Sequence, residues 1–291
     1  MNKSQSATIN LIECPRDAMQ GWKPFIPTKQ KIEYLNALLK VGFHTIDFGS
    51  FVSHTVIPQM SDTSEVLKGL EINSEVGTKL LAIVANIRGA EAAMEFEQIK
   101  YLGFPFSISP SFQLRNTNST MEQSLQTVSS IQSLCHQSNK ELIVYMSMGF
   151  GNPYRDEYSE SILIKWTEEI LNRGIRIISL ADTVGLASVN QIRFALRALI
   201  PSYKDTLFGV HLHANSINWK QKFHAALDEG CVRFDGALKG IGGCPMAQDE
   251  LVGNMDSILM IEYLKEKRGG SISINEEALN ESIRIANQIF I

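Results

Sequence analysis

The chain has 291 residues, of which 44% are hydrophobic and 20% are charged, and its formal net charge is −4. A mildly acidic chain without a basic run lacks the charge pattern of nucleic-acid-binding proteins, and no stretch is apolar for long enough to cross a membrane. We therefore expect neither a nucleic acid nor a membrane as a partner. The length fits one α/β barrel or two smaller domains.

The start of the chain, residues 1–10, is polar and lacks the apolar core of a secretory signal. The four cysteines are Cys14, Cys135, Cys231 and Cys244, and they form no Cys-x-x-Cys pair. Neither a zinc site built on cysteine nor a disulfide framework is indicated. We expect free thiols in a cytoplasmic protein.

Short apolar runs rich in β-branched residues alternate with stretches of helical spacing along the chain. Strands are predicted over 7–13, 43–48, 79–85, 104–108, 141–146, 176–181, 207–211 and 232–237. Helices are predicted over 28–41, 64–71, 89–101, 120–137, 160–172, 188–199, 219–229, 249–267 and 275–289. Strands that alternate with helices of this length form βαβ units and a parallel sheet.

Eight such units in a chain of this length predict an α/β fold of the (β/α)8 TIM-barrel type, with an additional C-terminal helix over 275–289. A doubly wound open sheet is the alternative. No Gly-x-Gly-x-x-Gly follows the first strand, so a dinucleotide-binding half is not indicated. No linker rich in proline, glycine or serine divides the chain, and we predict a single catalytic domain over 1–291.

Active sites of such barrels lie at the C-terminal ends of the strands, and this sequence places polar residues at those ends. In chain order they are Arg16, Asp17, Gln20, Asp47, Ser50, Asn86, Ser147, Asp182, Thr183, His211, His213, Lys239 and Asn254. Chance does not readily place two histidines and three carboxylates around one ring. We therefore expect the functional site at this end of the barrel.

His211 and His213 stand two residues apart at the end of an apolar run. Residues i and i+2 of a strand point to the same side, so both imidazoles would point to one place and begin a divalent metal site. With Asp17 and Asn254 they form a mixed oxygen and nitrogen set that suits Mg²⁺, Mn²⁺ or another divalent ion. The alternatives are a packed histidine pair, a loop carboxylate and a helix amide.

Arg16 carries a permanent charge that suits a carboxylate or an enolate oxygen. A salt bridge from Arg16 to Asp47 or Asp182 is the plainer alternative. Asp47 is either a base or a structural partner of Arg16, and poor solvation inside the barrel should raise its pKa. Lys23 could face an anionic ligand, although a solvated lysine is the simpler interpretation.

The glycine-rich segment 240–245 ends in the Cys244 thiol and Pro245. Glycines allow a loop to hinge, so this cysteine could approach a ligand as the loop closes. The segment lacks the lysine and the hydroxyl of a phosphate-binding P-loop. A simple turn with a buried thiol is the alternative.

Several short motifs occur in a characteristic order. They are Pro15-Arg16-Asp17 with Gln20, Ser50-Phe-Val-Ser53, Pro58-Gln-Met60, Ser179-Leu-Ala-Asp-Thr-Val-Gly185, His211-Leu-His213, Gly240-Ile-Gly-Gly-Cys-Pro245 and Gly253-Asn254. This ordered set covers most of the chain and resembles the 3-hydroxy-3-methylglutaryl-CoA lyase family. Each motif alone is weak, but Gly-Gly-Cys-Pro after His-x-His is specific.

The resemblance implies a TIM barrel that cleaves 3-hydroxy-3-methylglutaryl-CoA to acetyl-CoA and acetoacetate, as in leucine degradation, with Mg²⁺ or Mn²⁺ and usually as a homodimer. It implies Asp17, His211, His213 and Asn254 as metal ligands. It implies Arg16, Asp47, His211 and Cys244 as catalytic groups, with Arg16 stabilising an enolate. It implies substrate contacts by Arg16, Gln20, Lys23, Ser50, Asp182 and Thr183.

The sequence also departs from the family pattern. Asp47 stands where the family has a glutamate, so its carboxylate falls short by about a bond length. Ala18-Met19 replaces Gly-Leu, Ala214 replaces an aspartate and Met246 replaces an aromatic residue. A lyase, aldolase or condensing enzyme acting on another 3-hydroxyacyl-CoA or a 2-oxo acid is therefore an alternative, and a non-catalytic metal-binding barrel is a more distant one.

Overall fold

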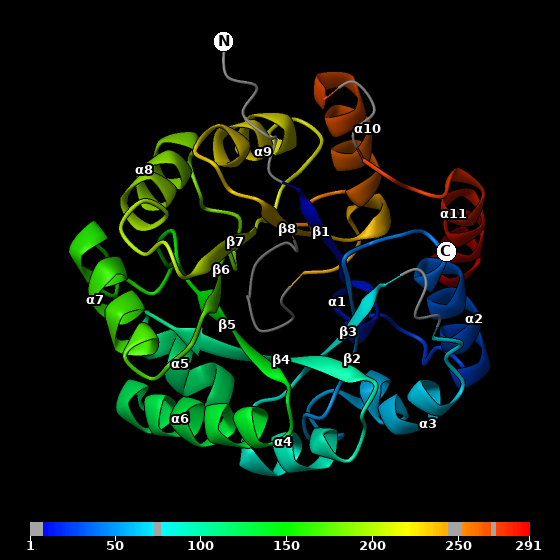
Figure 1. Cartoon of the computed structure of the whole chain (residues 1–291), viewed down its shortest axis with the longest axis horizontal. Coiled ribbons are helices and arrows are strands. Elements are labelled where there is room, and N and C mark those ends of the chain that lie inside the picture. Colours follow the sequence, from blue (N-terminus) through cyan, green and yellow to red (C-terminus); the bar gives the residue numbers. More distant parts are fainter. Residues whose placement is uncertain (1–7, 73–76, 244–251, 269–271) are drawn as a thin grey trace.

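The computed structural model describes residues 8–72, 77–243, 252–268 and 272–291. Its parallel strands form a closed barrel in the order β1 to β8, and β1 closes the ring by pairing with β8. Helices surround this ring, with the strands at the centre (Figure 1). The predicted (β/α)8 barrel is confirmed.

The strands match the predicted ranges closely except at β4, which begins five residues earlier than predicted. They are β1 (Asn10–Glu13), β2 (Thr45–Ser50), β3 (Lys79–Ile83), β4 (Ile99–Ser107), β5 (Glu141–Ser147), β6 (Ile177–Ala181), β7 (Leu207–His211) and β8 (Arg233–Gly236).

The helices include two that the sequence analysis did not predict, α1 and α5, both of which begin at a proline in the first turn. The α-helices are α1 (Pro15–Gln20), α2 (Thr28–Leu39), α3 (Thr63–Lys68), α4 (Ile87–Met94), α5 (Pro110–Thr117), α6 (Met121–Gln137), α7 (Glu160–Leu171), α8 (Val189–Leu199), α9 (Trp219–Asp228), α10 (Ser257–Arg268) and α11 (Glu276–Ile289). Two single 3₁₀ turns are η1 (Pro58–Met60) and η2 (Leu238–Gly240). None of the helices in the described part of the chain has the length and apolar character needed to span a bilayer.

Two predicted helices were wrong at one end. The helix predicted over 89–101 ends at Met94, because pairing with β3 draws Ile99 and Tyr101 into β4. Of the helix predicted over 249–267, residues 249–251 lie outside the described residues, and residues 252–256 precede the helix, which begins at Ser257. Before it, Asn254 and Asp256 form single bridges to His213 and Ala237, which keep this segment extended. Tertiary pairing overrides local helix propensity in both places.

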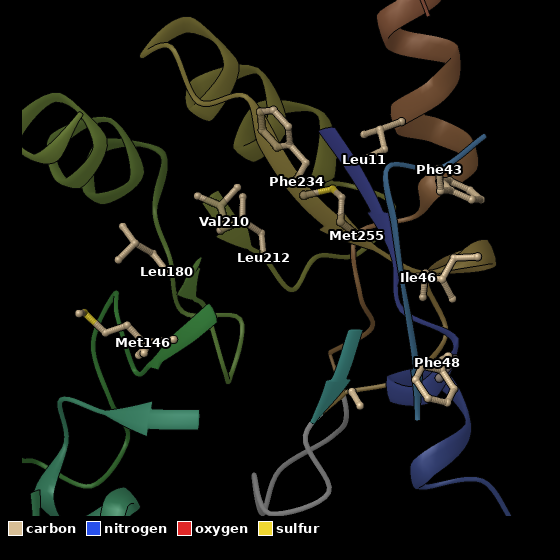
Figure 2. Packing of buried hydrophobic residues seen from close by; sticks show 14 of the residues in the cluster. Leu11, Phe43, Ile46, Phe48, Met146, Leu180, Val210, Leu212, Phe234 and Met255 are labelled. Atoms are coloured by element: carbon tan, nitrogen blue, oxygen red, sulfur yellow. The ribbon is translucent and has the colours of Figure 1, made fainter. Parts of the chain in front are cut away.

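Alternate residues of each strand face opposite sides of the barrel wall. The outward set packs in the large hydrophobic core, where Figure 2 shows Val210, Phe234 and Met255 among its members. A separate small cluster contains Leu81, Tyr101, Ile143, Tyr145 and Ile177, at the alternate, inward positions of neighbouring strands. Beyond Leu207, the inward positions of β7 and β8 are instead small or polar, with Gly209, His211, Arg233 and Asp235. The candidate site lies at this end of the barrel.

Candidate active site

The two histidines meet at the C-terminal end of β7. His211 ends the strand, and His213 follows and pairs with Asn254 in an isolated antiparallel bridge. The Nδ1 of His213 lies 2.9 Å from the carbonyl oxygen of Val252. Because a carbonyl only accepts, this Nδ1 carries the proton and Nε2 keeps its lone pair.

His211 is oriented in a similar way. Its Nδ1 lies 3.4 Å from Oδ2 of Asp235, and its Nε2 lies 3.3 Å from Nε2 of His213. Two lone pairs at this distance repel each other unless a proton or a cation lies between them. Burial, together with the neighbouring His211, lowers the pKa of His213 to about 4. Burial would lower the pKa of His211 too, but the hydrogen bond and charge of Asp235 raise it.

Asp17 and Asn254 complete this group. The nearest ligand atoms of Asp17, His211 and His213 lie within 4.8 Å of one another. Asn254 donates through Nδ2 to Asp17, at 2.6 Å, and to the carbonyl of Ile241, at 2.9 Å. Its Oδ1 is buried and has no hydrogen-bond partner among the described residues.

An orphaned buried carbonyl oxygen costs about 1–3 kcal/mol, so this amide indicates a missing partner. A carboxylate, two neutral imidazoles and an amide oxygen are together the donor set of a hard or borderline divalent cation. The residues of this structure therefore fit the Mg²⁺ or Mn²⁺ expected from the sequence.

A second possible cluster shares His211 and adds Cys14 and Asp235. Arg233 already donates to Asp235 at 2.7 Å, so a cation there would meet a guanidinium. Burial raises the pKa of the Cys14 thiol well above its usual value, which keeps the sulfur protonated. The cluster with Asp17 is the better cation site.

Arg16 lies beside this cluster on α1, a short helix that begins directly after β1 because Pro15 occupies its first turn. Its Nε lies 3.1 Å from Oδ2 of Asp47, and its Nη1 donates to Gln20 at 2.8 Å and to Asp17 at 3.1 Å. Burial raises the pKa of Asp47 to about 6, although the Arg16 charge opposes the shift. The expected Arg16–Asp47 pair and the expected rise of this pKa are both present.

A cavity of about 250 Å³ opens above these groups. Its polar lining includes Arg16, Asp17, Gln20, Asn116, Tyr145, Ser147, Thr183, His211 and His213. Its apolar lining includes Val52, Val56, Ile57, Ile83, Pro105 and Phe112. The cavity lining thus combines charged and imidazole groups with apolar side chains.

Three other predicted site residues, Ser50, Asp182 and Lys23, do not line the cavity. Ser50 accepts from the Val52 amide at 3.2 Å, and Asp182 accepts from Lys222 at 2.7 Å. Lys23, which the structure also describes, is outside the lining. Cys244 lies outside the described residues.

Lys222 gives Asp182 an indirect role that the sequence did not reveal. Its Nζ donates to Asp182 and also to the carbonyl oxygen of His213, at 2.8 Å. The Asp182–Lys222 pair therefore fixes the main chain that carries a predicted metal ligand. Lys222 lies on α9 and not at a strand end, so only its contacts in the folded protein identify this role.

Sequence reasoning also missed Arg233, Asp235 and Tyr145, because the ranges 141–146 and 232–237 were treated as packing strands. The sequence did contain one indication that Arg233 and Asp235 belong to the site. Arg233 and Asp235 occupy alternate positions of a buried strand, so both point to the same side of the sheet. Charged residues in that pattern rarely serve packing alone.

The sequence model of the HMGL-like family matches residues 10–286. The chain belongs to the HMGL-like family. Among curated HMGL-like relatives, a hydroxymethylglutaryl-CoA lyase of Bacillus subtilis is 31% identical over 256 residues, which cover 87% of this chain and 84% of the relative. The human mitochondrial hydroxymethylglutaryl-CoA lyase is 29% identical over 275 residues, which cover 94% of this chain and 83% of the relative.

Solved structures agree with this membership. An HMG-CoA lyase from Acinetobacter baumannii, in complex with coenzyme A and 3-methylmalate, matches with a TM-score of 0.89 and 28% identity. The match covers 99% of this chain and 93% of the other. The HMG-CoA lyase of Bacillus subtilis matches with a TM-score of 0.88, also at 28% identity, over 97% and 94% of the two chains. The family resemblance inferred from the motifs is confirmed.

Proposed function

We propose that this HMGL-like protein is a carbon–carbon lyase that cleaves 3-hydroxy-3-methylglutaryl-CoA to acetyl-CoA and acetoacetate, with Mg²⁺ or Mn²⁺ as its cofactor. Its relatives from Bacillus subtilis and Acinetobacter baumannii are named as lyases of this substrate. The observation that carries the proposal is the convergence of the His211 and His213 Nε2 atoms beside Asp17. An acyl-CoA is accordingly the proposed partner.

Asp17, His211, His213 and the Oδ1 of Asn254 would hold the cation. When bound, a divalent cation lowers the pKa of a coordinated hydroxyl and polarises a carbonyl. The Val252 carbonyl and Asp235 fix the two rings, so both Nε2 atoms face the site without further rearrangement. Asn254 donates to Asp17 at 2.6 Å, so its amide already lies beside the ligand set.

Arg16 is the residue that we assign to the developing charge. Cleavage of the bond between C2 and C3 leaves its electron pair on the acetyl-CoA fragment as an enolate. Arg16 lines the cavity with a permanent positive charge, and Asp47 and Gln20 hold its guanidinium in place beforehand. A charge already oriented toward the place where an oxyanion forms stabilises the transition state more than the substrate.

Asp47 supports this step without touching the substrate. Its side chain is 1% exposed and lies behind Arg16, outside the cavity lining. We therefore assign the carboxylate to positioning Arg16, a role that a shorter side chain than glutamate can fill if the guanidinium shifts toward it.

The last step returns a proton to the enolate carbon. Cleavage also removes the proton of the C3 hydroxyl, so one proton leaves the substrate before one is delivered to carbon. The family resemblance proposes His211 for this transfer, and its ring lines the cavity. With Nε2 on the cation, its one proton would be that on Nδ1, which faces Asp235. Cys244 is the second candidate, and its proposed role rests on the family resemblance alone. Gln20 and Thr183 line the same cavity and are proposed substrate contacts.

The direct test is release of acetoacetate and acetyl-CoA from 3-hydroxy-3-methylglutaryl-CoA by purified protein. The assay contains Mg²⁺ or Mn²⁺, with and without EDTA, and includes a reducing agent. Metal-dependent release of both products is expected. No product from a protein that still binds metal would refute this substrate and direct the search to other 3-hydroxyacyl-CoA thioesters.

Homodimer formation and a cytoplasmic location stay predictions. The buried free thiols of Cys14, Cys135 and Cys231 are compatible with a reducing compartment. Light scattering of the eluted protein measures the first prediction, and fractionation of the source cells measures the second.

A further inference from the structure

Arg233 is a buried cation inside the barrel that the proposed mechanism does not use. It is the first residue of β8, and only 3% of it is exposed. Its Nη1 donates to Asp235 at 2.7 Å, and its Nη2 donates to the phenol oxygen of Tyr145 at 3.2 Å. One guanidinium therefore bridges β8 and β5 across the interior.

Both partners of Arg233 lead to the candidate metal site. The second oxygen of Asp235 faces Nδ1 of His211 at 3.4 Å. The Tyr145 ring meets the His211 ring edge to face, with centroids 6.0 Å apart, and Tyr145 lines the cavity. His211 is thus held through its nitrogen by Asp235 and through its ring by Tyr145.

The neighbouring strand leaves room for this arginine. A Cβ on Gly209 of β7 would lie 3.0 Å from the Cβ, Cγ and Cδ atoms of Arg233. Side chains rarely approach so closely, so a larger residue at position 209 would displace the arginine stem. The glycine and the arginine are complementary features of adjacent strands.

A charged pair in this place does not serve stability alone. The interior of a TIM barrel is usually filled by branched apolar side chains. Burying two charges has a desolvation cost that an ion pair often fails to recover compared with apolar residues of similar size. The burial of Arg233 and Asp235 is therefore better explained by a role in the candidate site next to them than by stability.

We propose that Arg233 is a positioning residue of the metal centre: its fork holds Asp235 against His211 and holds the Tyr145 phenol at the cavity wall. This inference rests on the proposed metal site. A planar guanidinium can serve two acceptors in fixed directions, whereas a lysine ammonium is a compact point charge on a flexible stem. Substitution by lysine therefore tests the geometry while keeping the charge.

The test is the Mn²⁺ dissociation constant of the metal-stripped full chain, measured from the signal of free Mn²⁺ in electron paramagnetic resonance. Two variants are compared with the wild type, Arg233→Lys and the double variant Arg233→Met with Asp235→Asn, which leaves no unpaired buried charge. Loss of a residue that orients a metal ligand typically weakens metal binding about 10–100-fold. We expect a loss in this range for the double variant and a smaller loss for Arg233→Lys.

Lys140→Met is the matched control. Lys140 is also a buried cation, but its Nζ donates to the main-chain carbonyl oxygens of Phe96 and Ile99, next to the N-terminal end of β5. This variant should lower the thermal midpoint of unfolding and leave the Mn²⁺ dissociation constant unchanged. A general loss of stability is thereby separated from a loss of positioning.

The outcomes distinguish this inference from the proposed function. If the wild type binds Mn²⁺ and folded Arg233→Lys binds it equally well, the positioning role is refuted and the proposed function stands. If the wild type binds no Mn²⁺, the proposed metal site fails and the inference fails with it. Weaker binding by Arg233→Lys, with Lys140→Met unchanged, supports the inference even if the double variant does not fold.

Discussion

The Nε2 atoms of His211 and His213 lie 3.3 Å apart, and each ring turns its Nδ1 toward an acceptor. In this arrangement neither ring can donate to the other without a change of tautomer or an added proton. The pair is therefore arranged for a cation that both lone pairs can share, and its position beside Asp17 supplies the first negative charge.

His213→Ala should abolish tight metal binding and reduce acetoacetate formation to background, because no other described side chain offers an imidazole at this position. Mn²⁺ binding and product release measure the two effects. The control is His136→Ala, which removes an exposed histidine on α6. A metal-replete His213→Ala protein with near-wild-type turnover would contradict the ligand assignment.

Asp47→Asn should lower kcat by about 10–100-fold while the Mn²⁺ dissociation constant changes little, because a misplaced guanidinium costs roughly two orders of magnitude in rate. Steady-state kinetics and Mn²⁺ titration test the two parts. Asp62→Asn is the matched control, since Asp62 pairs with buried Lys31 at 2.7 Å and lies outside the cavity lining. An unchanged kcat in Asp47→Asn would show that Arg16 needs no such support.

Tyr145→Phe should separate substrate binding from metal binding. The variant keeps the ring beside His211 and the Arg233–Asp235 pair, so Mn²⁺ affinity should stay within about twofold of the wild type. It removes a phenol from the cavity wall, and a lost hydrogen bond of about 1 kcal/mol corresponds to a several-fold change in kcat/KM. Equal kcat/KM in both proteins would show that the phenol does not contact the substrate.

Glu13 should make stability depend on pH. Its carboxylate accepts from the Leu238 amide at 2.8 Å and contacts Ser257, and burial raises its pKa from 4.5 to about 8. Between these pH values the folded protein keeps a proton that the unfolded chain releases. The contribution to the free energy of unfolding is therefore complete below pH 4.5 and declines as pH rises to about 8, by at most about 1.4 kcal/mol per pH unit.

The Glu13→Gln variant isolates the contribution of Glu13 ionisation to the free energy of unfolding, because an amide has no proton to release. Chemical denaturation of both proteins at several pH values gives the difference in free energy of unfolding. That difference should shift in favour of Glu13→Gln as pH rises from 5 to 8. A difference that is constant over this range would show that Glu13 is ionised in the folded protein.

The sequence was sufficient to predict which candidate site residues lie together where those residues are neighbours in the chain. His211 and His213 could be placed on one side because strands repeat every two residues, and Arg16 with Asp17 followed directly from the end of the first strand. Asn254 was proposed from the chemistry of its amide oxygen, but the bridge that places it opposite His213 came only from the structure.

Contacts between distant segments explain what the sequence could not show. Arg233 and Tyr145 are 88 residues apart, and Lys222 and Asp182 are 40 apart. Their contacts depend on strand register and on the space that Gly209 leaves, neither of which local patterns specify. A contact between distant segments also explains the wrong end of the helix predicted over 89–101, because pairing with β3 places Ile99 and Tyr101 in a strand.

The most direct test of the central claim is titration of the metal-stripped protein with Mn²⁺, with bound Mn²⁺ and acetoacetate formation measured in the same samples. The account predicts one tight Mn²⁺ per chain and a rate that rises in proportion to it, with both signals lost in His213→Ala. Full turnover in the stripped protein, or tight Mn²⁺ binding that persists in His213→Ala, would contradict it.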